Sequence, residues 1–237
     1  MTDITKRQHI HQRDGIAESI KDIILGGQDG LVNVLGVILG VAAATSDVKY
    51  TIIAGIAATF AESISMAAVA YTSSEAAKEF YLSELRREER EIDEVPHLEK
   101  AEIRAIYKKK GFSGGLLNQI VNRITSNRKL WVNTMMTEEL KMSEEDFENP
   151  LKSALVVGIS SFAGSFVPLL SFLLGFGIIR AVYFSVVLSA LVLFVTGAIK
   201  AKLTVGKWYK AGIEMALIGI LAALIGYGIG RGLGVVI

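Results

Sequence analysis

The sequence predicts an all-α membrane protein: five transmembrane helices, with a helical cytoplasmic insert between the second helix and the third. The first observation behind this prediction is composition, because hydrophobic residues make up 51% of the 237 residues and the mean hydropathy is +0.43. Soluble domains are rarely so apolar. The second observation is the placement of charge, because residues 75–149 carry 13 of the 25 Lys and Arg and 16 of the 24 Asp and Glu.

The chain therefore divides into three parts. Residues 1–74 are expected to form a surface helix and the first two transmembrane helices, residues 75–150 the helical insert, and residues 151–237 the last three transmembrane helices. The chain has no cysteine, which excludes disulfides, thiolate metal sites and thiol catalysis. No short apolar segment with a cleavage site follows the polar start MTDITKRQHIHQRDG, so we expect no cleaved signal peptide.

The first transmembrane helix is expected over residues 23–45, after a short amphipathic surface helix over residues 14–22. About 20 apolar residues span a bilayer, and this segment qualifies if it can hold Asp29, which has Gln28 and Asn33 beside it. A carboxylate in hydrocarbon costs about 2.5–3.5 kcal/mol on insertion scales. We therefore expect Asp29 to face a cavity, a partner or a permeating cation.

The second transmembrane helix is expected to begin near Thr51, after a tight turn, and to stay apolar to about Tyr71. Good helix formers without Gly or Pro follow, so this helix should continue into water for several turns. Two further polar helices are expected in the insert. One covers residues 96–110, where a proline suits the first turn, and the other covers residues 116–142, with an interruption near Ser126.

The last three transmembrane helices are expected over residues 151–174, 181–201 and 208–233. Pro168 lies inside the first of them. An internal proline is tolerated in a membrane helix when neighbouring groups satisfy the freed carbonyl, so we expect a kink there.

The basic residues predict the orientation of the chain. Nearly all Lys and Arg outside the spans lie on the side of the N-terminus and the insert, and the opposite side has only Lys49, Arg180 and Arg231. The positive-inside rule then places the N-terminus and the insert in the cytoplasm and the C-terminus outside. Because no targeting extension precedes the first span, we expect the plasma membrane of a prokaryote rather than a vacuolar membrane.

Glycines recur at four-residue spacing in the first and last transmembrane helices. They are Gly26 and Gly30, Gly36 and Gly40, and Gly226, Gly230 and Gly234. Small residues at this spacing let two helices approach closely. The pattern is equally compatible with packing inside one subunit and with a dimer interface.

Three side chains of the first two transmembrane helices predict a metal site in the membrane. The short connection makes these helices antiparallel neighbours, which places Asp29 and Met66 at a similar depth, roughly 10–12 Å below the cytoplasmic edge. Glu62 is one turn deeper than Met66. Two carboxylates and a thioether suit a borderline divalent transition metal better than an alkali ion. The alternatives are ordinary packing for Met66 and a hydrogen bond between helices for Glu62.

The insert carries acids at helical spacing, which predicts a second metal site. Glu84, Glu88 and Glu91 lie on one helix face, and Glu99 and Glu102 on another. Like charges at this spacing repel, and a bound cation would offset the repulsion. The third helix adds Met135, Met136, Glu138, Glu139, Met142, Glu144 and Glu145. The alternative is a solvated acidic face whose charges pair with Arg86, Arg87 and Arg90.

At this point the residues resemble the vacuolar iron transporter family. The resemblance is carried by IKDIILGGQDGLVNVLGVILGVAAA at residues 20–44, by Ser65-Met66, by Asn149-Pro150-Leu151 and by VPLL at residues 167–170. It covers the chain from Gly15 onward. It implies five spans with a helical cytoplasmic insert, a homodimer, and transport of ferrous iron, often also manganese, out of the cytoplasm in exchange for protons.

The resemblance also implies roles for individual residues. Asp29 and Met66 match the metal-translocating pair of the family. The acids that match the Glu-x-x-Glu pairs of its insert are Glu88, Glu91, Glu99 and Glu102, and those that fall where the third-helix ligands belong are Met135, Met136 and Glu139. Where the family commonly has Gly-Glu after the methionine, this chain has Val69-Ala70, and Glu62 is the candidate substitute. Gln28 replaces a usual asparagine.

The sequence thus predicts a dimeric transporter that exports ferrous iron, with manganese as a second substrate, and not an enzyme. Its expected partners are divalent metal ions, protons and the lipid bilayer, with no nucleic acid and no prosthetic group. The alternative is a membrane-anchored metal sensor or scaffold whose insert recruits a protein partner. A membrane enzyme with a carboxylate metal site is disfavoured, because the insert has almost no histidine and no cysteine.

Overall fold

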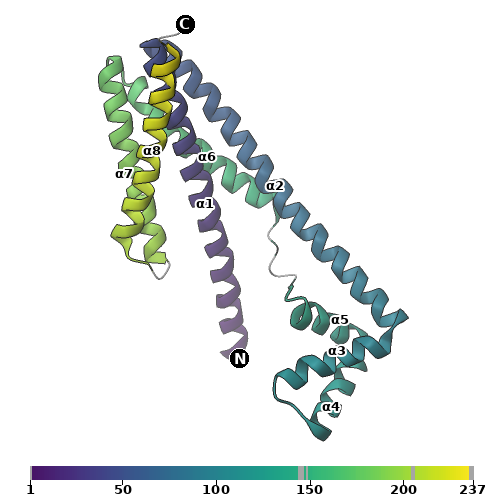
Figure 1. The fold of residues 1–237 in the computed structure, drawn as a ribbon. Helices are drawn as coiled ribbons and strands as arrows, with labels where there is room; N and C mark the ends of the chain where they lie inside the picture. The colour runs from purple at the N-terminus through teal and green to yellow at the C-terminus, as the bar shows by residue number, and fades with distance from the viewer. Residues whose placement is uncertain (1, 144–146, 148, 204–205, 235–237) are drawn as a thin grey trace. The chain divides into compact units, whose positions relative to one another are not determined.

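The computed structural model describes residues 2–143, 147, 149–203 and 206–234, with side chains from residue 19 onward. Every regular element in these ranges is a helix (Figure 1). In chain order the elements are α1 (Thr2–Thr45), α2 (Val48–Glu94), α3 (Pro96–Lys109), α4 (Gly114–Thr125), α5 (Arg128–Thr134), the π-helix η1 (Met135–Glu139), α6 (Pro150–Leu173), α7 (Ile178–Leu203) and α8 (Trp208–Gly234).

Five of these helices are long and apolar enough to cross a membrane. The spans are Ser19–Thr45, Val48–Glu94, Pro150–Leu173, Ile178–Leu203 and Trp208–Gly234. The predicted all-α fold with five apolar spans is therefore confirmed. At 47 residues, α2 is much longer than the about 20 residues that a bilayer requires. As expected, it continues without a break into the charged part of the chain.

The chain forms two compact units. Unit 1 consists of Met1–Tyr71 and Leu151–Ile237, and unit 2 consists of Thr72–Pro150. The helix α2 contributes to both, because its apolar part up to Tyr71 belongs to unit 1 and its charged part to unit 2.

The beginning of the chain differs from the sequence-based expectation. Residues 14–22 do not form a separate surface helix, because α1 runs unbroken from Thr2 to Thr45. No proline interrupts the backbone hydrogen bonds in this stretch. The turn to α2 is also shorter than expected and consists of Ser46 and Asp47. The Asp47 carboxylate accepts hydrogen bonds from the backbone N–H of Lys49 and Tyr50, at 2.7 and 3.2 Å, and thereby caps the start of α2.

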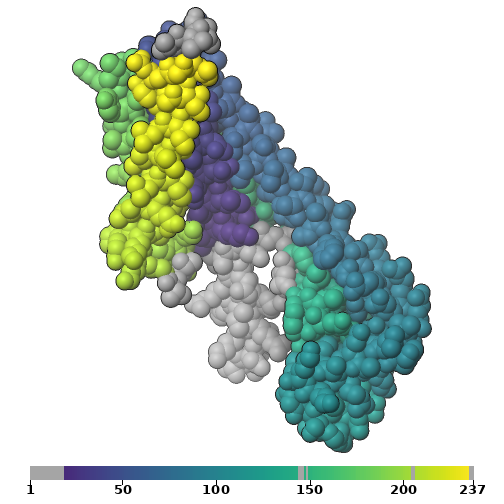
Figure 2. Space-filling model, viewed as in Figure 1, coloured from purple at the N-terminus to yellow at the C-terminus, as the bar shows by residue number. Residues whose placement is uncertain are grey.

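Unit 1 is held together by close contacts between helix backbones. The helix α8 packs along both α1 and α7 (Figure 2). A Cβ atom on Gly226 would collide with the carbonyl of Gly36, and one on Gly230 with the carbonyl of Gly40. These glycines of the four-residue pattern therefore pack α1 against α8 within one chain.

A second backbone contact joins α1 to α6. A Cβ atom on Gly26 would collide with the carbonyl of Val157, and one on Gly164 with the carbonyl of Gly27. The largest buried side chains around this framework include Leu35, Ile38, Leu169 and Phe172. Many apolar side chains elsewhere on α2, α6, α7 and α8 remain exposed, as contact with lipid requires.

Unit 2 packs α3, α4, α5 and η1 against the charged part of α2. Its core consists of Ile92, Ile103, Leu117, Val121, Ile124, Trp131, Val132, Met135 and Met136. The interruption expected near Ser126 is present, because α4 ends at Thr125 and the Asn127 side chain caps α5 by accepting from the Leu130 N–H at 3.0 Å. The last helical segment ends at Glu139, earlier than the expected Met142.

Candidate functional site

The helices α1 and α2 bring two carboxylates together within unit 1. Glu62 accepts a hydrogen bond from Nδ2 of Asn33 at 3.0 Å and also interacts with the side chain of Asp29. Both carboxylates are half-buried. The capped two-residue turn makes α1 and α2 antiparallel, and this sets residues 29 and 33 of one helix opposite residue 62 of the other. Two carboxylates in contact repel each other unless a cation or a proton lies between them.

Met66 lies one turn from Glu62 on α2, half-buried. The structure therefore places a thioether on the same helix as one of the two paired carboxylates. Asn33, which sequence analysis noted only as a neighbour of Asp29, makes the direct hydrogen bond to Glu62. Its polarity within an apolar run was the signal for this contact.

Asp22 is a buried acid that sequence analysis did not single out. Only 9% of its surface is exposed, and one carboxylate oxygen accepts a hydrogen bond from the Ser153 hydroxyl at 2.6 Å. This bond ties α1 to the start of α6. No local pattern predicts it, because the two residues are 131 positions apart.

A second group of acids lies in unit 2. Glu88 and Glu91 on α2 and Glu99 on α3 each offer an oxygen, and these oxygens all lie within 4.8 Å of one another. Glu88 and Glu99 are 1% and 3% exposed. Among the described residues, Oε2 of Glu88 and Oε2 of Glu99 have no hydrogen-bond partner. Burying such atoms unpaired is unfavourable, and a bound cation would compensate for it.

The turn between α2 and α3 brings these acids together. Pro96 opens α3, and the Val95 N–H bonds the Glu91 carbonyl at 2.8 Å, so the chain reverses within about one residue. The core side chains Ile92 and Ile103 then pack α3 back against α2. This packing sets Glu99 against Glu88.

Two more acids, Glu102 on α3 and Glu139 on η1, interact with this group, and we call Glu88, Glu91, Glu99, Glu102 and Glu139 the acid cluster. Burial raises the pKa of Glu99 to about 7, with Glu102 and Glu88 as the next causes. The pKa of Glu139 is also raised to about 7. Burial is the largest cause, and the charges of Glu102 and Glu88 come next. A cation entering the cluster would displace protons from these groups.

The π-helix η1 positions the third-helix residues. Its wide turn is formed by bonds such as that from the Leu140 N–H to the Met135 carbonyl at 3.2 Å. Met135 and Met136 are fully buried in the core of unit 2, while Glu139 joins the acids. π-Helices occur frequently at functional sites, and no signal in the sequence had indicated one here.

Glu138 is directed to a different set of partners. It forms ion pairs with Lys110 and, at 3.6 Å, with Lys141. The hydrogen bond from Lys110 is the main reason why the pKa of Glu138 lies below its ordinary value. The structure thus separates Glu138 from the acid cluster. Glu144 and Glu145 lie outside the described residues, and Met142 packs on the core of unit 2.

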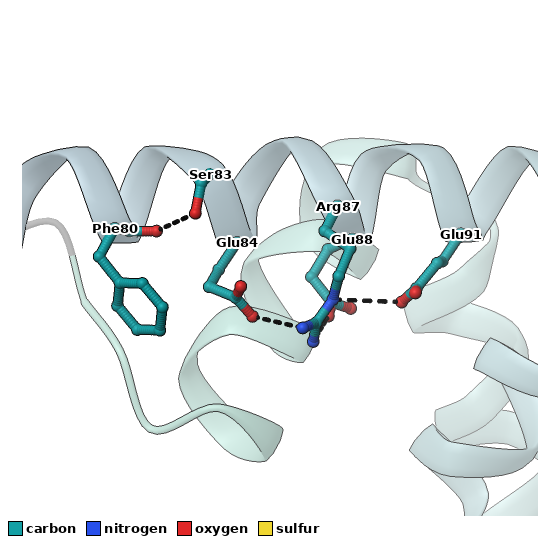
Figure 3. A network of polar contacts seen from close by, with 6 residues as sticks. All are labelled: Phe80, Ser83, Glu84, Arg87, Glu88 and Glu91. Atoms are coloured by element: carbon teal, nitrogen blue, oxygen red, sulfur yellow. Dashed lines mark hydrogen bonds and ion pairs between the residues drawn. The ribbon is translucent and has the colours of Figure 1, made fainter.

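Arg87 lies among the acids of α2 (Figure 3). Its guanidinium nitrogens contact Glu84 at 2.7 Å, Glu88 at 3.3 Å and Glu91 at 3.7 Å. Three arginines, Arg86, Arg87 and Arg90, were the expected counterions for this face. Of these, Arg86 instead donates from Nε to the Leu82 carbonyl of its own helix, at 3.1 Å.

Comparison with known proteins adds independent information. The model of the VIT family matches residues 20–231. The chain is 32% identical over 215 residues to vacuolar iron transporter 1 of Arabidopsis thaliana, covering 91% of this chain and 86% of that one. It is 30% identical over 224 residues to vacuolar iron transporter 1 of Eucalyptus grandis, with coverages of 94% and 90%. It is also 30% identical over 222 residues to the vacuolar iron transporter of Plasmodium falciparum, with coverages of 90% and 81%. These relatives are named as transporters, not as enzymes.

Proposed function

The chain belongs to the VIT family, and we propose that it exports divalent transition metal, ferrous iron first and manganese second, from the cytoplasm in exchange for protons. Three features support the proposal. They are the named iron transporters that share about 30% of its residues, the paired carboxylates in its apolar helices, and the acid cluster of unit 2.

In this proposal the acid cluster captures metal. Carboxylate oxygens suit ferrous and manganous ions. Met135 and Met136 lie in the core of unit 2, so the carboxylates of the acid cluster would be the ligands that capture the metal. Because Glu99 and Glu139 have a pKa of about 7, they are partly protonated at neutral pH. Capture would then release protons, and a fall in local pH would favour release of the metal.

The membrane acids would pass the metal across the bilayer. Asp29, Glu62 and Met66 supply two carboxylates and a thioether from α1 and α2. The Asp29–Glu62 pair would be neutralised by a metal ion in one state and by protons in the other. Antiport requires such an exchange of metal for protons at one site. Glu62 would thereby take the role of the carboxylate that the family carries after its methionine.

The distribution of Lys and Arg supports an N-terminus and a unit 2 on the cytoplasmic side, with the C-terminus outside. The family resemblance supports a homodimer. The α1–α8 glycines add nothing to the case for a dimer, because they are used inside the chain.

The observation that carries this proposal is the contact of Glu62 with Asp29 and Asn33 inside two apolar helices. The test is flux in sealed proteoliposomes, with Fe²⁺ under anaerobic conditions and with Mn²⁺, each measured with and without a pH gradient. We expect uptake that a pH gradient drives and that Asp29→Asn abolishes. Metal binding without any flux would instead favour a sensor or scaffold.

A further inference from the structure

Arg87 is the cation closest to the acid cluster on α2. All its ion pairs among the described residues are with Glu84, Glu88 and Glu91 of the same helix (Figure 3). These ion pairs do not tie α3 or η1 to α2, although the charge of Arg87 also acts through space on Glu139 of η1. Removal of Arg87 should therefore leave the packing of unit 2 intact.

Arg87 only partly neutralises the cluster. Its shortest contact, 2.7 Å, is with Glu84, which lies outside the cluster, and its contacts with Glu88 and Glu91 are longer, at 3.3 and 3.7 Å. The second oxygen of Glu88 and one oxygen of Glu99 stay buried without a partner. These unpaired oxygens are acceptors that a further positive charge could satisfy.

Because of the chemistry of arginine, Arg87 and a metal ion would compete for the carboxylates of Glu88 and Glu91. A guanidinium does not lose its proton in proteins, so Arg87 can stop neutralising Glu88 and Glu91 only by moving away from them. The side chain is 43% exposed, and its Nε is buried without a hydrogen-bond partner, so no hydrogen bond at Nε has to break when the guanidinium moves. Glu84, 15% exposed and three residues earlier on α2, already holds one of its nitrogens.

We propose that Arg87 is a tethered cation that competes with the metal for Glu88 and Glu91, and that Glu84 holds the guanidinium once the metal has bound. This inference rests on the proposed role of the acid cluster in metal capture. The competition lowers the affinity of the cluster, so that captured metal can be released. It also favours divalent ions over monovalent ones, because a single charge gains little by replacing another.

The first test compares two arginines on the same helix. Anaerobic calorimetry with Fe²⁺ on the full chain in detergent should show that Arg87→Gln binds about five-fold more tightly than the parent, the upper range for a partly exposed ion pair. The matched control, Arg86→Gln, removes the same charge one residue away and should change affinity by less than about two-fold. Arg87→Lys keeps the charge and should remain close to the parent.

The second test uses Glu84. Glu84→Gln should weaken Fe²⁺ binding by about three-fold, because displaced Arg87 then has no carboxylate to move to. In the Arg87→Gln background, Glu84→Gln should have no more effect than the exposed control Glu89→Gln. Such non-additivity is the signature of two residues that act through each other.

The outcomes separate this inference from the proposed function. Loss of Fe²⁺ binding in Glu99→Gln would show that the acid cluster binds the metal. If Arg87→Gln then bound Fe²⁺ as tightly as the parent or more weakly, the inference about Arg87 alone would be overturned. Additive effects of Glu84 and Arg87 would remove the role of Glu84. If the parent chain bound Fe²⁺ no better than Glu99→Gln, the capture role and this inference would both fall.

Discussion

The membrane helices pair two carboxylates, Asp29 and Glu62, with one amide, whereas unit 2 gathers five carboxylates, two of which contact Arg87. The membrane pair is half-buried and has Asn33 as its hydrogen-bond donor. The acid cluster buries Glu88 and Glu99 almost completely and leaves an oxygen of each unpaired. The two regions therefore differ in how much of their charge the protein itself compensates.

This difference suggests different tasks. A site with two unpaired carboxylate oxygens and Arg87 as a competitor is suited to accept a cation and release it again. A site with one pair of carboxylates in apolar surroundings is suited to hold a single cation briefly.

The largest effect is expected at Asp29. Asp29→Asn should lower Fe²⁺ flux per folded transporter on the order of 100-fold, because a neutral amide is a poor ligand and cannot exchange a proton. The melting temperature in detergent should be unchanged or higher, since a charge leaves an apolar helix. The control is Asp47→Asn, which keeps a good N-cap and should retain flux. If Asp29→Asn melted at a lower temperature yet kept its flux per folded molecule, Asp29 would be a structural residue and not a metal ligand.

In unit 2, replacing Glu88, Glu91, Glu99 and Glu102 together by Gln should weaken Fe²⁺ binding by on the order of 30-fold. Folding should be kept or improved, because mutual repulsion and buried charge are both relieved. Calorimetry and thermal melting of the detergent-solubilised chain measure the two quantities. The same loss of charge at Glu75, Glu79, Glu89 and Glu94 is the control. Equal affinities in the two variants would show that the cluster is only a solvated acidic face.

The pH dependence of metal binding should separate the regions further. Glu99 and Glu139 have a pKa of about 7, so they hold protons that a metal must displace. Between pH 6 and 7, Mn²⁺ affinity should rise by up to about ten-fold for each proton released. Titration calorimetry in buffers of different ionisation enthalpy counts these protons. Glu99→Gln should flatten the profile, and a pH-independent affinity in the parent would contradict the assignment.

The same groups predict an unusual stability profile for the metal-free chain. Acids whose folded pKa lies above the unfolded value bind more protons when folded, so their contribution to the free energy of unfolding is present below the unfolded pKa and is lost as pH rises. For Glu99 and Glu139 the loss should occur between about pH 4.5 and 7. Thermal melting across this window should show a larger decrease in the parent than in Glu99→Gln.

The smallest effect is expected at Met66. Met66→Leu keeps a similar volume, so folding should be retained. Fe²⁺ flux should fall by about three-fold, and Mg²⁺ flux, if any, should be unaffected, because a thioether favours softer ions. Competition assays in proteoliposomes measure the ratio. An equal fall for both ions would assign Met66 to packing.

Local patterns predicted much of the fold. Composition and the length of apolar runs were sufficient for the five spans, and the break near Ser126 follows from an asparagine that caps the next helix. The spacing of Glu84, Glu88 and Glu91, and that of Glu99 and Glu102, predicted two acidic helix faces. That these faces meet depends on the sharp turn at Pro96.

The contacts that sequence analysis missed are those between distant residues. Asp22 meets Ser153 across 131 positions, and Lys110 draws Glu138 away from the acid cluster across 28. The π-helix η1 is a backbone adjustment that no periodicity announces. In each case tertiary packing determines the side-chain partner or the backbone geometry, because the local sequence favours no single one.

The glycine contacts between α1 and α8 have a mechanical consequence. Where Gly226 meets Gly36 and Gly230 meets Gly40, carbonyl groups rest directly on the opposite backbone, and no side chain can rotate to absorb a sliding motion. The two helices should therefore behave as one stiff rod during transport. If Asp29 on α1 has the translocation role proposed above, access to it would then depend on movement of the elements around these two helices. One of these is α2, where Glu62 contacts Asn33 of α1.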